Sequence, residues 1–342
     1  MKHASRLSGT AVLILVPIFA LAACGSGSGT KGAKAPSAAA TTAGKTLRIG
    51  FFGFAKSNSF AEASFAGIQQ AAAQNNATAT FVDPNFSPPT QISQVQDAVV
   101  SKRFDVLIIQ AIDGTAIVPA VKQAVAAGLT VVAEFSPIGG RYDTVAAQVP
   151  RTISIVDAPV FNGQGLATLG LGACKKAAAN PCKVAYLSGS NPGAPIEDTR
   201  TNAVVAGLKA GGADVVASVV GGYTADAGRT AFQTVLQAHP DVNVVIGSTQ
   251  AIEGAAPLAS GKKIEFVGNG GSTQAVQAVQ SGAWYGIYIV PEKADGAKAA
   301  ELGLGKARGR NVPTSVDSRS LTPYRALGTK ARLSGVSGDY KD

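Results

Sequence analysis

The side chains that could bind a ligand in this chain follow its apolar runs, near the points where strands would end. They are amides, a hydroxyl, a carboxylate, an arginine and aromatic rings, and the candidate contacts are Asn58, Phe60, Gln110, Phe135, Ser136, Asp157, Arg200, Gln250 and Asn269. A ligand rich in hydroxyl groups needs a hydrogen-bonding partner for each hydroxyl, and its C–H faces pack on aromatic rings. These residue types therefore indicate a site for a small neutral polyhydroxyl molecule.

Some of these residues have an alternative, structural explanation. Asn58 and Asp157 stand where each could cap a following helix, and Arg200 could be solvated instead of facing a ligand. Asp113 is better explained as a helix cap than as a ligand group, which leaves Gln110 as the expected contact of its loop.

Catalytic chemistry has few residues available. Once His3 is removed with the N-terminal signal described below, His239 is the one histidine left, and its place at a helix end before Pro240 favours a structural role. No histidine or cysteine cluster has the spacing of a metal site, and residues 50–53 lack the pattern of a phosphate-binding loop. We therefore expect no enzyme activity, no metal and no cofactor.

Charge also bears on the choice of partner. The formal net charge is +9, but it includes Lys2, Arg6, Lys31 and Lys34 near the start of the chain, and the other basic residues are scattered. Nucleic-acid binding requires a clustered basic surface, so a nucleic-acid partner is not expected.

A strand–helix–strand unit over residues 104–133 shows how the candidate residues are positioned. Its first strand, residues 106–109, is apolar without alternation, as in a parallel strand covered on both faces. Apolar residues then recur every fourth position between Asp113 and Gly128, which predicts a helix with one buried stripe. The carboxyl ends of such strands form the edge where open α/β folds bind ligands.

The same alternation of strand and helix continues along the chain from residue 46 to residue 290. Two consecutive sets of about five such units predict an α/β fold with two doubly wound lobes, because one parallel sheet of that many strands would be unusually wide. A helix over 291–310 and a strand over 314–321 have no partners of their own. We expect them to return to the first lobe and then to cross again.

The N-terminus predicts export. Lys2 and Arg6 precede an apolar run over residues 11–23 that is too short for a stable membrane anchor and is typical of a secretory signal. Residues 21–25 (Leu-Ala-Ala-Cys-Gly) resemble the bacterial lipobox, which makes 1–23 a lipoprotein signal peptide and Cys24 the lipidated residue. The alternative is an ordinary signal peptide with an incidental cysteine.

The other composition signals agree with an exported protein. Residues 24–45 have almost no large apolar side chain and form the expected flexible tether. Cys174 and Cys182 are the other two cysteines, and in an oxidising compartment a short-loop disulfide is expected, the alternative being two unrelated buried thiols. Residues 339–342 (Asp-Tyr-Lys-Asp) could begin an epitope tag, but the intact signal favours a native end.

Over residues 46–325 the chain resembles the periplasmic sugar-binding proteins of the ribose/galactose type, the exported receptors of ABC importers. The resemblance is carried by Asn58-Ser59-Phe60, residues 104–133 and 184–189, Arg200, His239-Pro240-Asp241 and residues 264–271. It implies two Rossmann-like lobes that close on a solute by hinge motion. It assigns residues 46–154 plus 290–313 to an N-terminal lobe, 155–289 plus 314–330 to a C-terminal lobe, and the crossovers to 153–156, 288–291 and 313–316.

The resemblance also implies roles for individual residues. Asn58 and Phe60 fall on ligand positions of the first lobe, and Arg200 falls on a sugar-clamping arginine of the second. Elsewhere the family's charged or amide groups are replaced, at Phe135-Ser136, Asp157-Ala158, Thr249-Gln250, Gly270 and Ile289. Lost carboxylates and a lost arginine mean fewer bidentate clamps on neighbouring hydroxyls. We therefore expect a less polar pocket that takes a smaller polyol, a deoxy sugar or another modest neutral molecule.

Together these observations predict a monomeric solute-binding lipoprotein of an ABC importer, held by its lipid on the outer face of the cytoplasmic membrane. Its permease and ATPase partners would be separate chains. The alternatives are a sensor that presents its closed form to a membrane receptor kinase, and a binder of a non-sugar small molecule.

Overall fold

The computed structural model describes residues 44–190 and 192–342. The predicted signal peptide over 1–23, the lipidation site Cys24 and all but the last two residues of the predicted tether over 24–45 lie outside the described residues.

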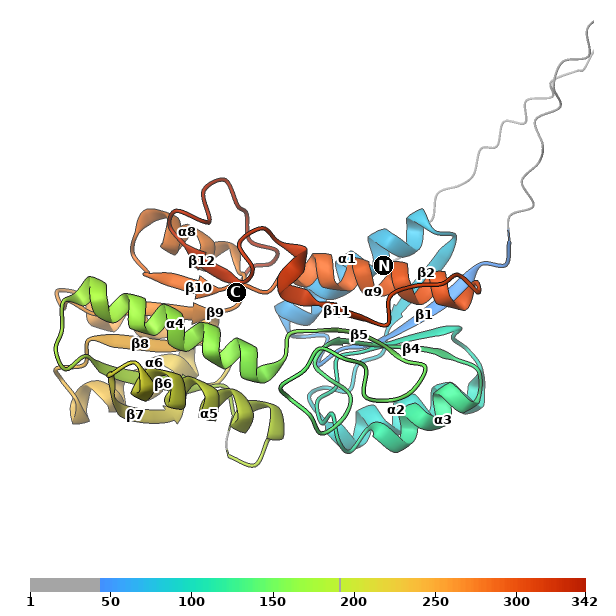
Figure 1. Ribbon diagram of the computed structural model, residues 1–342, viewed down its shortest axis with the longest axis horizontal. Helices are drawn as coiled ribbons and strands as arrows, with labels where there is room; N and C mark the ends of the chain where they lie inside the picture. Colours follow the sequence, from blue (N-terminus) through green and yellow to red (C-terminus); the bar gives the residue numbers. More distant parts are fainter. Residues whose placement is uncertain (1–43, 191) are drawn as a thin grey trace, which may run out of the picture. The chain divides into compact units, whose positions relative to one another are not determined.

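The first lobe is built on a parallel six-stranded sheet with the strand order β11-β5-β4-β3-β1-β2. Its strands are β1 (Leu47–Phe52), β2 (Ala77–Phe81), β3 (Val106–Ile109), β4 (Thr130–Phe135), β5 (Ile153–Val156) and β11 (Ser315–Asp317). Its helices are α1 (Ser59–Gln74), α2 (Pro88–Ser101), α3 (Val118–Ala126) and α9 (Glu292–Ala307). Helices α1 and α9 cover one face of the sheet, and α2 and α3 cover the other (Figure 1).

Strand β3 confirms that a run of apolar residues is buried on both faces. Val106 and Ile108 pack with the core beneath α1 and α9, whereas Leu107 and Ile109 pack with the core beneath α2 and α3. All four side chains are fully buried. The absence of alternation in this stretch is thus explained by two cores, one on each side of the sheet.

The second lobe has a six-stranded sheet with the order β12-β10-β9-β8-β6-β7, in which β12 alone is antiparallel to its neighbour. Its strands are β6 (Lys183–Ser188), β7 (Asp214–Val220), β8 (Val244–Ser248), β9 (Glu265–Asn269), β10 (Gly286–Tyr288) and β12 (Leu327–Thr329). Its helices are α4 (Pro159–Ala177), α5 (Pro195–Ala210), α6 (Ala225–Ala238), α7 (Thr249–Ala255) with the short 3₁₀ helix η1 (Ala256–Ala259), and α8 (Thr273–Ser281). Helices α4 and α5 cover one face, and α6, α7 and α8 cover the other.

The chain passes between the two sheets three times, after β5, after β10 and after β11. Helix α9 returns to the first lobe and packs on α1, as expected from the sequence. The assignment of residues 155–156 and 314–317 to the second lobe was wrong, because Ile155 and Val156 pair with β4 on one side and with Val316 and Asp317 of β11 on the other. The last crossing therefore lies later, through η2 (Ser318–Leu321).

Cys174 and Cys182, at the end of α4 and the start of β6, are joined by a disulfide with their Cα atoms 5.6 Å apart. Both residues are buried against the core shared by α4 and α5. The bond ties the first helix of the second lobe to the first strand of its sheet.

Replacing both cysteines by alanine should lower the free energy of unfolding by about 2.5 kcal/mol, because a loop closed over a separation of eight residues restricts the unfolded chain by about that amount. The melting temperature should fall by several degrees. Thermal unfolding of the wild type and the double variant tests this, with a reductant expected to lower the midpoint of the wild type only. Equal midpoints would show that the bond contributes no stability.

Three carboxyl groups are fully buried in the first lobe, Glu134 on β4 and Glu292 and Asp295 in the first turn of α9. Burial raises the pKa of Glu134 from 4.5 to about 7, although Ser64 donates a hydrogen bond to it at 2.7 Å. Burial, followed by the nearby Glu134 carboxyl, raises the pKa values of Glu292 and Asp295 well above their usual range. The folded chain therefore holds these protons more tightly than the unfolded chain.

This burial predicts a stability that falls as the pH rises. A carboxyl whose pKa is raised by folding gives its full contribution below about pH 4.5 and loses it as the pH passes about 7, a loss of about 3 kcal/mol for Glu134. Glu134→Gln, which keeps a hydrogen-bonding group without the charge, should be the more stable protein at about pH 8. Denaturant unfolding across this range tests it, with the exposed Asp97→Asn as the control. A Glu134→Gln variant that shows the wild-type pH dependence would contradict the account.

Candidate ligand-binding site

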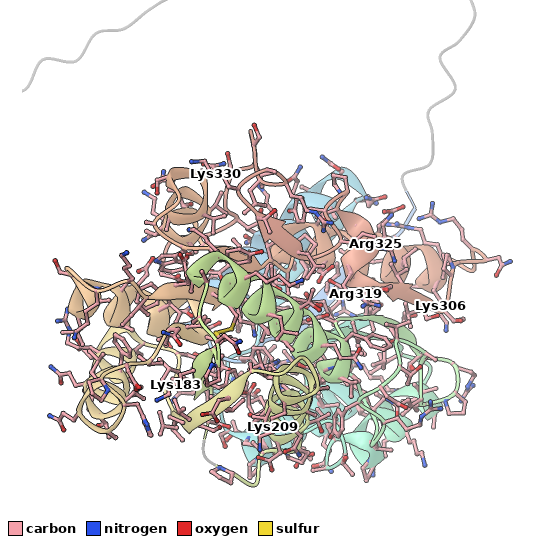
Figure 2. The ribbon with its side chains drawn as sticks, turned by 60° about the vertical axis from the view of Figure 1, so that its left-hand side comes forward. Lys183, Lys209, Lys306, Arg319, Arg325 and Lys330 are labelled. Carbon is pink, nitrogen blue, oxygen red and sulfur yellow. A yellow bond between two sulfur atoms is a disulfide. The ribbon has the colours of Figure 1, made fainter. Side chains whose placement is uncertain are left out.

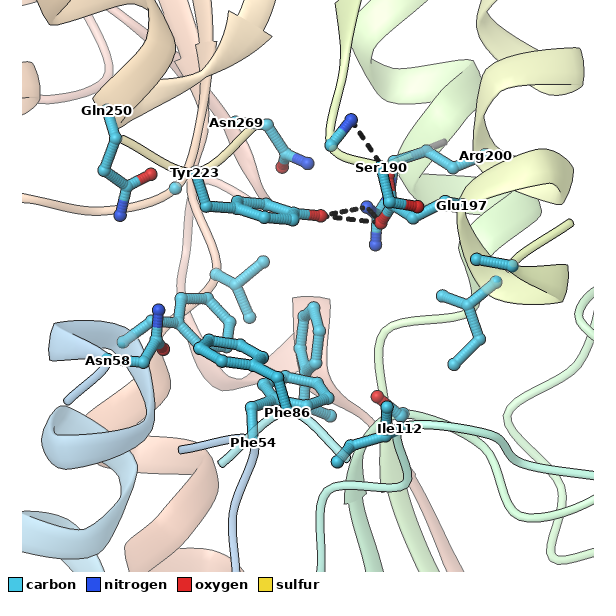
Figure 3. Close-up of a pocket in the computed structure, with 18 of the residues that line it drawn as sticks. Phe54, Asn58, Phe86, Ile112, Ser190, Glu197, Arg200, Tyr223, Gln250 and Asn269 are labelled. Carbon is cyan, nitrogen blue, oxygen red and sulfur yellow. Dashed lines mark hydrogen bonds and ion pairs between the residues drawn. The ribbon is translucent and has the colours of Figure 1, made fainter. Parts of the chain in front are cut away.

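A cavity of about 330 Å³ lies at the carboxyl ends of the strands of both sheets. Its lining residues come from the first lobe, the second lobe and the last residues of the chain. Figure 3 shows the cavity with residues of the two lobes labelled. They are Phe54, Asn58, Phe60, Phe86, Ile112, Phe135, Ser136, Gly189, Ser190, Ala194, Ile196, Glu197, Arg200, Tyr223, Gln250, Asn269, Gly270, Val290 and Tyr340. The expectation that ligand-binding groups gather at this edge thus agrees with the position of the cavity.

The first lobe gives the cavity an aromatic wall, made of Phe54, Phe60, Phe86 and Phe135. Phe54 and Phe86 lie in the segments that follow β1 and β2, Phe135 is the last residue of β4, and Phe60 lies in the first turn of α1. The ring centroids of Phe60 and Phe135 are 4.8 Å apart, and those of Phe54 and Phe135 are 6.0 Å apart, both with edge-to-face geometry. A wall of this kind offers an apolar surface to the C–H face of a ligand.

Two rings of the aromatic wall stand on backbone that L-residues rarely adopt. Phe86 has a φ of 57° and Phe135 a φ of 56°, both in the left-handed region. This conformation costs a bulky residue roughly 1–3 kcal/mol and tends to occur where a site needs a particular side-chain direction. At the end of β4 it turns the Phe135 ring onto Phe54 and Phe60.

The second lobe gives the cavity a polar wall, made of Ser190, Glu197, Arg200, Tyr223, Gln250 and Asn269. In Figure 3 these side chains lie opposite the labelled Phe54 and Phe86. Asn269, at the end of β9, accepts a hydrogen bond from Asn162 at 3.2 Å. The two walls differ in chemistry, so a ligand between them meets rings on one side and hydrogen-bonding groups on the other.

Glu197 and Arg200 form an ion pair within the polar wall, one turn apart on α5. Their side chains are only 12% and 6% exposed. Glu197 also accepts hydrogen bonds from Tyr223 Oη at 2.7 Å and from the Gly189 backbone N–H at 3.2 Å. Burial alone would lower the pKa of Arg200, but Glu197 together with Tyr223, Tyr186 and Asp157 outweighs it, and the net shift is upward. Arg200 therefore stays charged and is neutralised within its own lobe.

Seven of the nine predicted contacts line the cavity, and they are Asn58, Phe60, Phe135, Ser136, Arg200, Gln250 and Asn269. Asn58 was expected either to contact a ligand or to cap a helix. It lines the cavity and also caps α1, because its side chain accepts a hydrogen bond from the Ala61 N–H at 3.0 Å. Arg200 is buried rather than solvated.

The other two predicted contacts, Gln110 and Asp157, are buried behind the cavity and do not line it. Gln110 accepts a hydrogen bond from the Phe54 N–H at 3.3 Å and so positions the aromatic wall. Asp157 accepts from Asn162 and from Tyr288 Oη, each at 2.7 Å, and burial raises its pKa. It does not cap α4, whose N-cap is Ala158. Their expected ligand contacts are therefore corrected to positioning roles.

Several lining residues were missed by the sequence interpretation. Phe54, Phe86 and Tyr223 follow β1, β2 and β7, so the reasoning that selected the other strand-end residues would also have selected them. Glu197 could have been found by its spacing from Arg200. Tyr340 had no such signal, because nothing in the sequence brings residue 340 to the ends of these strands.

The rest of the described chain offers little other chemistry. His239 is the C-cap of α6 and is not among the lining residues. Over residues 44–190 and 192–342, no group of three or more His, Cys, Asp and Glu residues could hold a metal ion. In the same part of the chain no helix has the length and hydropathy to cross a membrane. The labelled basic residues in Figure 2 are spread over many elements rather than gathered in one stripe.

One parallel and one mostly parallel sheet joined by three crossings, with a cavity at the carboxyl ends of both, define a two-lobed solute-binding protein. The sequence matches the family model of the periplasmic binding protein domain over residues 49–311. The chain belongs to this family, as expected from the sequence, and is therefore a binding protein of the extracytoplasmic space and not an enzyme. None of the curated proteins matches the sequence.

Solved structures with the same fold include two ABC transporter solute-binding proteins and a myo-inositol binding protein. A solute-binding protein from Actinobacillus succinogenes with bound D-allose is 19% identical, with a TM-score of 0.71, over 85% of this chain and 100% of its own. One from Mycobacterium smegmatis with bound glycerol is 21% identical, with a TM-score of 0.68, over 87% and 100%. The Caulobacter myo-inositol binding protein is 20% identical, with a TM-score of 0.69, over 85% and 96%. At these identities the similarity shows the shared fold.

Proposed function

We propose that this protein is the solute receptor of an ABC importer and that it captures a monosaccharide, a deoxy sugar or a polyol between its lobes. The observation that carries this proposal is the charge of the cavity. Among the described lining residues, Glu197 and Arg200 are the charged ones, and they pair with each other. A charged ligand would enter without a free counter-ion, so the site favours a neutral one.

The size and walls of the cavity support a small ligand with one apolar face. A volume of about 330 Å³ is near the lower end of the range of roughly 300–1,000 Å³ that is usual for small-molecule sites. The aromatic wall suits the C–H face of a sugar ring, and the polar wall offers partners for its hydroxyls. D-allose and myo-inositol, which are bound in two of the similar structures, combine ring C–H faces with hydroxyls, and glycerol, which is bound in a third, is a smaller open-chain polyol.

A thermal-shift screen with pentoses, hexoses, deoxy sugars and polyols tests the proposed ligand class, since a ligand that binds the folded chain raises its melting midpoint. We expect hits among these neutral compounds. A shift confined to amino acids or nucleosides would instead support the alternative of a non-sugar ligand. A sensor for a membrane receptor kinase would bind its ligand in the same cavity. It would differ from an import receptor only in the membrane protein that it contacts.

The proposal includes a lipid anchor at Cys24 and separate permease and ATPase chains, with the receptor itself a monomer. Cys24→Ser should release the protein from the membrane fraction into the medium or the periplasm, because a residue without the thiol cannot be acylated. Fractionation of cells expressing the wild type and the variant tests this. A variant that stays with the membranes would rule out lipidation at Cys24.

A further inference from the structure

The last four residues of the chain, 339–342, lie against the first turn of α8 in the second lobe. The Asp339 N–H donates to the Gly271 carbonyl at 3.0 Å, and the Tyr340 carbonyl accepts from the Thr273 N–H at 2.7 Å and from its hydroxyl at 3.0 Å. Ser272 and Tyr340 thus form a parallel β-bridge. Gln274 then holds Asp342 on both sides, donating to its carbonyl at 2.9 Å and accepting from its N–H at 3.3 Å.

The same segment reaches the first lobe. The Asp339 carboxylate accepts a hydrogen bond from the Lys293 N–H, at the start of α9, at 3.2 Å. The Tyr340 ring lies edge-to-face with Phe60 of the aromatic wall, with their centroids 6.0 Å apart. Residues 339–342 therefore contact both lobes at the cavity.

Tyr340 fills a space that the second lobe leaves for it. Tyr340 is 8% exposed and lines the cavity, and its hydroxyl oxygen accepts from the Gly271 N–H at 3.0 Å. A Cβ atom at Gly270 would lie 2.6 Å from the Tyr340 hydroxyl, and Gly270 has a φ of 141° that a side chain would disfavour. Burial raises the pKa of the Tyr340 phenol, so the group stays protonated.

We propose that Tyr340 is a ligand-contacting residue and that residues 339–342 are a strap that joins the two lobes across the binding site. The ligand class rests on the function proposed above, whereas the strap itself does not. In this arrangement the tyrosine ring limits the size of the ligand, and the phenol adds one hydrogen-bonding group to the polar wall. Closure of the lobes is coupled to the position of the strap.

Amide hydrogen exchange tests the strap without any ligand, because each variant should release a different set of amides. Deletion of residues 339–342 should speed exchange at both Gly271 and Thr273 by at least about tenfold. Tyr340→Phe, which removes only the hydroxyl, should speed exchange at Gly271 and leave Thr273 protected. Lys341→Ala, at an exposed position of the same segment, should change neither. Wild-type protection of both amides in the deletion variant would overturn the proposal.

Titration calorimetry with glycerol, D-ribose, D-allose and myo-inositol tests the ligand contact. The tightest-binding probe should bind Tyr340→Ala at least about tenfold more weakly, while Lys341→Ala keeps the wild-type affinity. Unchanged binding to Tyr340→Ala would overturn the contact. If the wild type binds none of the four probes, the proposed ligand class fails instead. In that case the proposed contact between Tyr340 and these ligands is rejected as well. The amide exchange experiment still tests whether residues 339–342 join the two lobes.

Discussion

Replacing Arg200 by methionine should destabilise the protein by about 3 kcal/mol and weaken binding of a neutral ligand by more than tenfold. The reason is that Glu197 would be left as an unpaired charge in a site where its side chain is 12% exposed. Removing one partner of a buried ion pair typically costs about 3–5 kcal/mol, mostly through the charge left behind. Denaturant unfolding and calorimetric titration measure the two effects.

The matched control is the double variant Arg200→Met/Glu197→Gln, which removes both charges. It should recover much of the stability lost in the single variant, because no buried charge remains unpaired. Tyr223 could still donate its hydrogen bond, at present 2.7 Å from Glu197, to the glutamine oxygen. If the single and double variants were equally unstable, the ion pair would not be what holds this part of the polar wall.

Replacing Phe135 by alanine should abolish most of the binding, with affinity lower by at least about tenfold. The ring contacts both Phe54 and Phe60, so its loss removes the centre of the aromatic wall and frees its neighbours to move. Loss of a largely buried phenylalanine should also cost roughly 3–5 kcal/mol of stability. Titration with the best neutral ligand at a temperature where the variant is folded measures the effect on the site.

Phe232→Ala separates lost stability from lost contact. Phe232 is fully buried in the core under α6 and is not among the residues that line the cavity. Its truncation should lower the melting temperature as Phe135→Ala does and leave the affinity of the folded protein near that of the wild type. Comparable affinities for the two variants would mean that the aromatic wall is not a ligand surface.

The fold was largely predictable because its signals are local. The unbroken apolar run of β3, the stripe of α3 and the strand-to-helix alternation all follow from burial of parallel strands on two faces. The lobe boundaries were less accurate, since they depend on the pairing of β5 with β11, which lie far apart in the sequence. Backbone pairing over such distances leaves no periodic trace in the sequence.

The candidate site was predictable to the extent that position after a strand determines it. This reasoning selected Phe135 and Asn269, which line the cavity, but it also selected Gln110 and Asp157, which lie behind it. Which way a strand-end side chain points depends on its partners, and Asp157 is turned inward by Asn162 and Tyr288. The sequence likewise did not show that the Arg200 guanidinium, expected to clamp a sugar, is paired with Glu197.

The buried partners of Asp157 also connect the crossings to the site. Asp157 follows β5 at the first crossing, and Tyr288 ends β10 just before the second. Asn162, which donates to Asp157, donates as well to Asn269 in the polar wall. A polar chain thus runs from two of the three crossings to the cavity, which gives Asp157 a role in positioning the lobes.

The central claim is that the cavity binds a neutral ligand because its own charges cancel. Calorimetric titration with matched pairs, such as D-galactose with D-galacturonate and D-ribose with D-ribose 5-phosphate, tests it most directly. The account predicts measurable binding of a neutral member and binding of its charged counterpart weaker by about a hundredfold or more, since Arg200 is already paired with Glu197. Equal or tighter binding of the charged member would contradict it.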